Sequence, residues 1–191
     1  MTRLKKIGFS KLSACFSLLI LAAALFFAPG MAASADDGFP GKIRLLANRQ
    51  YSEALLQGIG NARKSILCTF YVFKITSSAG NQPRRIAEEL IRAKKRGVDV
   101  TVILESDNGK KDRLTDENRH TAGFLTRGGV KVYFDSPSTV THVKAVVIDG
   151  RYVYLGSHNL TQAALRHNNE LSVLIDSPEM ASEIIDYMGK L

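Results

Sequence analysis

The stretch THVKAVVIDGRYVYLGSHN, residues 141–159, holds the features that decide the fold of this chain. Its apolar and β-branched residues form two runs on either side of Asp149-Gly150, a dipeptide that favours a two-residue hairpin turn. Side chains two positions apart on a strand point to the same face, so His142 and Lys144 are expected to project together. The stretch therefore predicts an antiparallel strand pair that presents an imidazole beside an ammonium group.

A hydroxyl and an amide follow the second of these strands, at Ser157 and Asn159. An ammonium group can neutralise phosphoryl oxygens, and an imidazole can attack phosphorus. The hydroxyl and the amide can donate hydrogen bonds to oxygens that gain charge during the attack. These residue types favour a site that binds and attacks a phosphate ester, and they require no metal ion. Asp149 is explained by the turn and is interpreted as mainly structural.

The order and spacing of these polar residues resemble the HKD signature of the phospholipase D superfamily. The resemblance rests on six positions: His142, Lys144, Asp149, Gly156, Ser157 and Asn159. Glu170 stands where that family has a glutamate hydrogen-bonded to the catalytic histidine. The length and the single motif resemble the short, Nuc-type endonuclease branch of the superfamily.

The resemblance implies a mechanism in which His142 attacks phosphorus and forms a covalent phosphohistidine. It implies that Lys144, Ser157 and Asn159 bind the phosphate oxygens, and that Glu170 orients His142. No metal and no other cofactor is implied. A second histidine must protonate the leaving oxygen, and no other histidine of the chain is followed by lysine two residues later. We therefore expect a homodimer in which two copies of His142 form one composite site.

The first 35 residues have the pattern of a secretory signal peptide. A basic start precedes an apolar run at residues 14–28, and Ala33-Ser34-Ala35 provides a cleavage site before Asp36. The apolar run is shorter than the roughly 20 residues of a membrane-spanning helix. An uncleaved anchor is the alternative interpretation. We expect export to the periplasm or the medium, and one catalytic domain over residues 36–191.

The charge and the cysteine content of the exported part limit its chemistry. The whole chain has 26 basic and 18 acidic residues, a net charge of +8. Four of the basic residues lie within residues 1–35, which leaves 22 against 18 and a net charge of +4. Total charge is therefore a weak argument for polyanion binding. Cys68 is the one cysteine after the signal, in an apolar run that favours burial, with an intermolecular disulfide as the alternative.

Apolar periodicity and turn residues predict a single α/β domain. The expected fold class is a mixed, largely parallel central sheet flanked by helices on both faces, as in phospholipase D-like nucleases. The expected strands cover residues 42–47, 65–74, 98–105, 130–134, 142–148, 152–155 and 169–176. The expected helices cover residues 52–63, 83–95, 113–126 and 178–190, and a further helix begins near residue 161.

Basic residues and histidines also occur outside the motif. The cluster at residues 92–96 is interpreted as the solvated face of an amphipathic helix. Lys110 and Lys111 lie on a polar connection of the type that supplies binding groups, so they are candidates for contacts with substrate phosphates. The remaining histidines lack metal-ligand spacing and are interpreted as surface or loop residues: His120, His158 and His167.

Three functions are compatible with the motif. The favoured one is metal-independent cleavage of DNA or RNA. The alternative is hydrolysis of phospholipids such as phosphatidylcholine or cardiolipin, which members of the superfamily cleave with the same site. An exposed apolar rim or a membrane-docking helix would favour that alternative, and the sequence after residue 35 indicates no clear candidate. A nucleic-acid-binding module without activity is the third, and the complete set of polar residues disfavours it.

Overall fold

The computed structural model describes residues 38–106 and 113–191, which fold around one seven-stranded sheet. The predicted signal peptide, residues 1–35, lies outside these ranges. In chain order the elements are β1 (Lys42–Ala47), α1 (Arg49–Asn61), β2 (Ser65–Phe70), α2 (Gln82–Lys95), β3 (Asp99–Leu104), α3 (Arg113–Arg127), β4 (Lys131–Phe134), β5 (Lys144–Ile148), β6 (Tyr152–Gly156), α4 (Gln162–Arg166), β7 (Leu171–Asp176) and α5 (Pro178–Met188).

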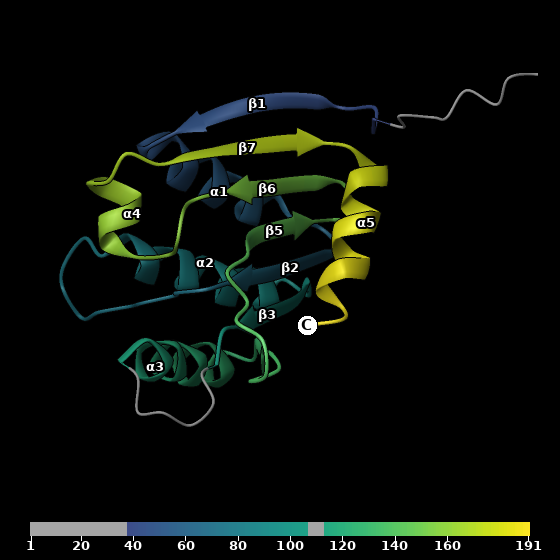
Figure 1. The fold of residues 1–191 in the computed structure, drawn as a ribbon. Helices are drawn as coiled ribbons and strands as arrows, with labels where there is room; N and C mark the ends of the chain where they lie inside the picture. Colours follow the sequence, from purple (N-terminus) through teal and green to yellow (C-terminus); the bar gives the residue numbers. More distant parts are fainter. Residues whose placement is uncertain (1–37, 107–112) are drawn as a thin grey trace, which may run out of the picture. The chain divides into compact units, whose positions relative to one another are not determined.

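The strands run in the order β1-β7-β6-β5-β2-β3-β4 across the sheet (Figure 1). Pairing is parallel between β2, β3 and β4. The other four pairings are antiparallel, including the predicted hairpin of β5 and β6 around Asp149-Gly150. The mixed sheet with helices on both faces is confirmed, but it is less parallel than expected. The reason is that the short hairpin reverses the chain, and antiparallel neighbours can be joined by such short turns.

Two apolar cores lie on the two faces of the sheet. The larger core packs α1, α2 and α3 against one face, and includes buried Leu55, Leu90 and Leu125. The smaller core packs α5 against the opposite face, around Val153 and Ala181. In Figure 1, α5 lies in front of the sheet, and α1 and α2 lie behind it. Burial of the whole central part of the sheet explains why its strands are continuous apolar runs.

Element boundaries deviate from the expected ones mainly at the edge of the sheet that carries the motif. The strand β5 begins at Lys144 and leaves His142 in the preceding loop, and β2 ends at Phe70. Cys68 is buried and has a free thiol, as its apolar neighbours predict. Within residues 38–106 and 113–191, no helix is both long enough and apolar enough to cross a membrane.

Candidate active site

Five of the predicted site residues lie at one edge of the sheet, where β2, β3 and β6 end and β5 and β7 begin: His142, Lys144, Ser157, Asn159 and Glu170. His142 lies two residues before the start of β5, and Ser157 directly follows β6. Glu170 directly precedes β7. Because β6 and β7 are antiparallel neighbours, the end of β6 and the start of β7 lie side by side, which brings Glu170 close to Ser157. Ligand sites of open α/β sheets commonly lie outside the carboxyl ends of parallel strands. The topology thus brings residues 28 positions apart in the sequence to one edge.

His142 is exposed and packs against Tyr71, which follows the end of β2. The two rings lie 4.5 Å apart between centroids, with an interplanar angle of 60°. The backbone N–H of Tyr71 donates to the carbonyl of Val143 at 3.1 Å, so the two segments are held together. His142 also lines an open pocket of about 370 Å³ together with Tyr187 and Lys190. The imidazole is therefore positioned on one side and accessible on the other.

Lys144 contacts the same tyrosine. Its Nζ lies 5.1 Å from the centre of the Tyr71 ring and donates to the carbonyl oxygen of His142 at 2.8 Å. The residue is only 5% exposed. Burial lowers the pKa of Lys144 below its ordinary value, and the negative charge of Glu170 partly opposes this effect. The lysine makes no ion pair with an acid among the described residues, so its charge is available to an anionic substrate.

A buried network fixes the segment that leads to His142. The Glu105 carboxylate, 4% exposed, accepts a hydrogen bond from the backbone N–H of Thr141. Asn118 of α3 donates from Nδ2 to the carbonyls of Tyr71 (2.9 Å) and Glu105 (3.0 Å). Sequence reasoning missed all three positioning residues, Tyr71, Glu105 and Asn118. The signal that could have found two of them is a polar or charged residue directly after a buried strand.

Ser157 and Glu170 form a pair at the ends of β6 and β7. The Ser157 hydroxyl donates to the Glu170 carboxylate and accepts from the backbone N–H of Leu171 at 3.1 Å. The other carboxylate oxygen of Glu170 accepts from Asn168 Nδ2 at 3.1 Å. The hydroxyl hydrogen of Ser157 is therefore engaged, and it can reach a phosphoryl oxygen only when the bond to Glu170 is released.

The expected hydrogen bond between the side chains of Glu170 and His142 is not present among the described residues. The hydrogen-bond partners of the Glu170 side chain are Ser157 and Asn168. The main chain of Glu170 is also fixed, through N–H donation to Asn48 Oδ1 at 2.9 Å. Glu170 lies beside the candidate site, but its orientation is set by Ser157 and Asn168 and by Asn48, which directly precedes α1.

The side-chain amide of Asn159 is fixed through its oxygen and leaves its nitrogen free. Its Oδ1 accepts from the backbone N–H of Val72 at 3.3 Å. Its Nδ2 makes no hydrogen bond to the described part of the chain, and the residue is half-buried. The neighbouring Leu160 is tied to the same segment, since its N–H donates to the Val72 carbonyl at 3.0 Å. The amide nitrogen is thus aimed by a fixed oxygen and remains free to donate.

His158 lies in the loop between β6 and α4, as one of the two predicted alternatives has it, but it is not a surface residue. Its side chain is 0% exposed and stacks on Tyr51, with ring centroids 4.3 Å apart. Nε2 lies 2.9 Å from the carbonyl of Asn48, which can only accept, so this nitrogen carries the hydrogen and Nδ1 accepts from Ser172 Oγ at 2.7 Å. Burial lowers the pKa of His158, opposed by the hydrogen bond to Asn48 and the charge of Glu170. His120 and His167 are exposed, as predicted.

Asp149 lies at the other end of β5 and does not join the site. Its φ is 56°, and its carboxylate accepts from the backbone N–H groups of Arg63, Lys64 and Ser65 at 2.7–3.1 Å. Burial would raise the pKa of Asp149, but the three amides and the charge of Lys64 lower it below its ordinary value. Asp149 therefore joins the hairpin to the start of β2, in agreement with a mainly structural role.

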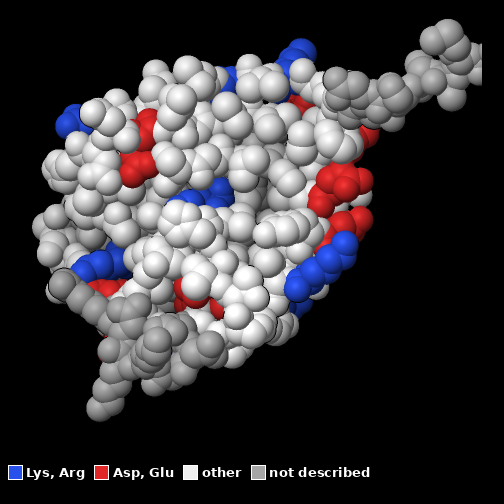
Figure 2. All heavy atoms as spheres, viewed as in Figure 1, with Lys and Arg blue, Asp and Glu red and all other residues white. Residues whose placement is uncertain are grey.

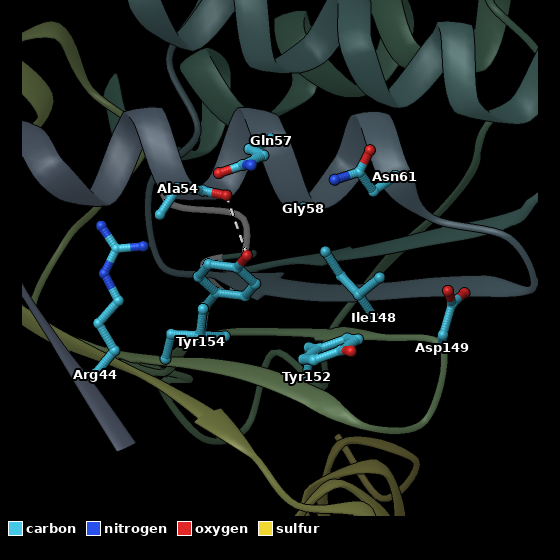
Figure 3. Close-up of a pocket in the computed structure, with 10 residues that line it drawn as sticks. Arg44, Ala54, Gln57, Gly58, Asn61, Ile148, Asp149, Tyr152 and Tyr154 are labelled. Carbon is cyan, nitrogen blue, oxygen red and sulfur yellow. Dashed lines mark hydrogen bonds between the residues drawn. The ribbon is translucent and has the colours of Figure 1, made fainter. Parts of the chain in front are cut away.

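A separate cavity of about 220 Å³ lies near Asp149, between α1 and the sheet (Figure 3). The Tyr154 hydroxyl points toward α1 and donates to the carbonyl of Ala54 at 3.1 Å. Asp149 stands at the rim, and Arg44 lies at the opposite side of the tyrosine. Because His142 and Asp149 flank opposite ends of β5, this cavity is distinct from the candidate active site.

Lys110 and Lys111, the predicted phosphate contacts, lie outside the described residues. Among residues 38–106 and 113–191, no group of three or more His, Cys, Asp or Glu side chains could hold a metal ion. The described part of the candidate site offers an exposed imidazole, a buried ammonium group and a free amide: those of His142, Lys144 and Asn159.

Comparison with known proteins places this geometry in a family. A family model described as a cardiolipin synthase, PLD-like domain matches residues 55–191, more than half of the chain. The chain belongs to this phospholipase D-like family. The match includes the whole edge of the sheet from β2 to β7.

Relatives within the phospholipase D-like family include longer proteins. The chain is 30% identical to cardiolipin synthase A of Proteus mirabilis over 163 residues, which are 82% of this chain and 30% of that protein. It is 30% identical to phospholipase D of Rickettsia bellii over 129 residues, 66% of this chain and 56% of that protein. The chain thus spans about a third to a half of the length of these relatives.

A solved structure with the phospholipase D-like fold covers most of the domain. Nuc from Salmonella typhimurium, described as a phospholipase D family member, superimposes with a TM-score of 0.65 and 25% identity. The superposition covers 78% of this chain and 91% of that chain. The single-sheet domain of this phospholipase D-like protein therefore corresponds to most of that solved chain.

Proposed function

We propose that this phospholipase D-like protein is a phosphodiesterase that cleaves nucleic acid through a covalent phosphohistidine at His142. The observation that carries the proposal is the convergence of three groups at one strand edge: the accessible His142 imidazole, the buried Lys144 ammonium and the free Asn159 amide. Similarity to Nuc over 91% of its length supports a nuclease, and relatives named phospholipase D and cardiolipin synthase support the broader class.

In the proposed reaction, His142 attacks phosphorus and the bond to the leaving oxygen breaks. Lys144 offsets the charge that develops on the phosphoryl oxygens, and Asn159 donates a hydrogen bond to one of them. Lys144 is effective because burial removes the water that would otherwise screen its charge. Water then attacks the phosphohistidine, and the histidine is regenerated with its phosphate released as a monoester.

The leaving oxygen needs a proton, which a second histidine would supply. We propose that this histidine is His142 of a second copy, because the chain has one His-x-Lys pair. The described surface offers a place for the second copy. Four exposed apolar side chains form an apolar strip beside the site: Ile43, Leu45, Leu155 and Leu171.

Strand register puts the apolar strip on one face of the sheet. Leu45 of β1 and Leu155 of β6 both pair with Val173 of β7, so all three point to the face covered elsewhere by α5. Figure 2 shows that uncharged atoms cover much of this face, with one basic patch near its middle. Soluble monomers rarely expose a large contiguous apolar patch, so covering the strip would be favourable. Leu155 and Leu171 adjoin Ser157 and Glu170, so a partner there would face the site.

Subunit mixing tests the shared site directly. Wild-type protein and a His142→Asn variant would be mixed in different ratios at constant total protein concentration, allowed to exchange subunits, and assayed on plasmid DNA with a chelator present. Because a mixed dimer would have one histidine, activity should fall with the square of the wild-type fraction, to about one quarter in an equal mixture. A fall in simple proportion to the wild-type fraction would contradict the shared site.

The apolar strip, together with the relatives named phospholipase D and cardiolipin synthase, favours the phospholipid alternative. An exposed apolar rim next to the site could rest on a lipid surface, and this rim was not evident from the sequence. Parallel assays on single-stranded DNA, RNA, and vesicles of phosphatidylcholine or cardiolipin separate the two functions. Cleavage of vesicles without cleavage of nucleic acid would replace the nuclease by a phospholipase. Loss of all activity in a chelator, restored by magnesium, would contradict the metal-independent mechanism.

A further inference from the structure

An open pocket of about 460 Å³ lies beside the candidate site, between the start of α1 and the end of α4. Its walls include two arginines, Arg49 and Arg166, and no acidic residue. We call it the Arg49–Arg166 pocket. Neither the HKD motif nor the proposed reaction at His142 uses these arginines.

The Arg49–Arg166 pocket is joined to the site through hydrogen bonds. Asn48 and Asn168 line the pocket. Asn48 makes two hydrogen bonds to the main chain of Glu170, both at 2.9 Å. The Glu170 N–H donates to Asn48 Oδ1, and the Asn48 N–H donates to the Glu170 carbonyl. Asn168 donates to the Glu170 carboxylate, which also accepts from Ser157. A substrate strand bound at His142 would therefore pass next to this pocket.

The two arginines are free to bind an anion. The Nε of Arg49 donates to the main-chain carbonyl of Arg166 at 3.4 Å, so the Arg49 side chain lies next to Arg166. Neither guanidinium forms an ion pair with an acid in residues 38–106 or 113–191. Arg92 of α2 and Arg96, which directly follows α2, differ because both pair with Glu89. Free guanidinium groups bind phosphate oxygens strongly, and often in bidentate geometry.

We propose that Arg49 and Arg166 bind a second phosphate of the substrate, next to the one attacked by His142. This inference rests on the proposed function and sharpens it, because it assigns the substrate class as a chain of phosphodiesters. Nucleic acid strands carry a charge about every 3.4 Å of helix axis, so a bound strand offers neighbouring phosphates to such a pocket. A substrate with a single phosphodiester would leave the pocket empty.

The test compares a substrate with many phosphates and a substrate with one. Steady-state rates would be measured on a single-stranded DNA oligonucleotide and on bis(p-nitrophenyl) phosphate. The variants are Arg49→Gln, Arg166→Gln and the corresponding Lys substitutions, which keep the charge. The control is Arg92→Gln, which removes an arginine already paired with Glu89. Thermal unfolding of each variant would verify its folding.

Each Gln substitution should raise KM for the oligonucleotide about tenfold and lower the slope of its salt dependence by about 1. Hydrolysis of bis(p-nitrophenyl) phosphate should be unchanged. The Lys variants should fall between wild type and Gln, and Arg92→Gln should match wild type. An equal loss on both substrates would overturn the inference, because the arginines would then support the catalytic geometry itself.

Failure of this inference and failure of the proposed function give different results. If wild-type protein cleaves the oligonucleotide and the Gln variants do so equally well, the Arg49–Arg166 pocket binds no phosphate and the nuclease stands. If wild-type protein hydrolyses bis(p-nitrophenyl) phosphate but no nucleic acid, both fall. If the Gln variants impair only hydrolysis of cardiolipin vesicles, the second phosphate is that of a lipid, and the assignment to nucleic acid is overturned.

Discussion

Removal of the Asp149 carboxylate should reduce the stability of the fold without disabling the site. The carboxylate accepts hydrogen bonds from three backbone N–H groups, those of Arg63, Lys64 and Ser65. Hydrogen bonds to a charged group contribute about 1.5–3 kcal/mol each when buried. Asp149 is only partly buried, so we assign each of these hydrogen bonds a reduced contribution of about 1 kcal/mol.

On this basis Asp149→Ala should lower the free energy of unfolding by about 4 kcal/mol, of which about 1 kcal/mol comes from placing alanine at a positive φ. Asp149→Asn keeps one acceptor oxygen and tolerates the positive φ, so it should cost about 1 kcal/mol. Asp186→Ala removes an exposed carboxylate of α5 and should change stability by less than about 0.5 kcal/mol. Urea unfolding at neutral pH measures all three values.

The dependence on pH has a defined sign. The pKa of Asp149 in the folded protein lies below its ordinary value of 3.8. Its stabilisation is therefore complete at neutral pH and is lost as the pH falls below 3.8. The difference in unfolding free energy between wild type and Asp149→Asn should shrink accordingly in acid.

The catalytic rate of the folded Asp149 variants should stay within about twofold of wild type, because roughly 20 Å of strand separates Asp149 from His142. The assay is hydrolysis of bis(p-nitrophenyl) phosphate under strongly native conditions. A large loss of turnover in Asp149→Asn with unchanged unfolding free energy would refute this reasoning, since the carboxylate would then act in the reaction.

Three further substitutions test the packing and charge of the site. Gly156→Ala should cost about 2 kcal/mol, because a Cβ there would lie 2.5 Å from Ser172 Cα; Gly123→Ala, with 3.4 Å to the nearest atom, is the matched control in thermal unfolding and should not destabilise. Lys144→Met should reduce turnover by at least about 100-fold while leaving stability equal or higher, since burial lowers the pKa of this lysine; a stable and active variant would exclude it from catalysis. Because the pKa of buried His158 is lowered from 6.5, wild-type stability should fall as the pH drops below 6.5; His158→Gln should flatten that dependence in urea unfolding.

Local sequence rules predicted the elements of this fold well. The alternation of apolar residues and the Asp149-Gly150 turn predict the hairpin of β5 and β6, which the strand register confirms. The first strand, residues 42–47, has the bounds expected. Such features depend on neighbouring residues alone, since strand periodicity and turn geometry are short-range properties. The spacing of His142, Lys144, Ser157 and Asn159 belongs to the same class, because all four lie on or beside one hairpin.

Long-range contacts were beyond these rules. His158 stands in a Gly-Ser-x-Asn turn and is locally indistinguishable from a surface residue, but α1 places Tyr51 and the Asn48 carbonyl against it. Glu105 and Asn118 are separated from Tyr71 by more than 30 residues. They reach it through the pairing of β2 with β3 and through the packing of α3 on the sheet. Their hydrogen bonds compensate for burial of polar groups, which is a condition set by the folded environment.

The functional groups of the candidate site could thus be predicted from a short run of residues, because they depend on residue type and on spacing along a strand. The orientation of these groups could not be predicted, because the edge of a sheet brings together segments that are distant in the chain. The Ser157 hydroxyl bonds to Glu170, and His142 packs on Tyr71 instead of bonding to Glu170. Both contacts follow from strand order and helix packing, because these decide which polar groups are buried and which partners they find for hydrogen bonds.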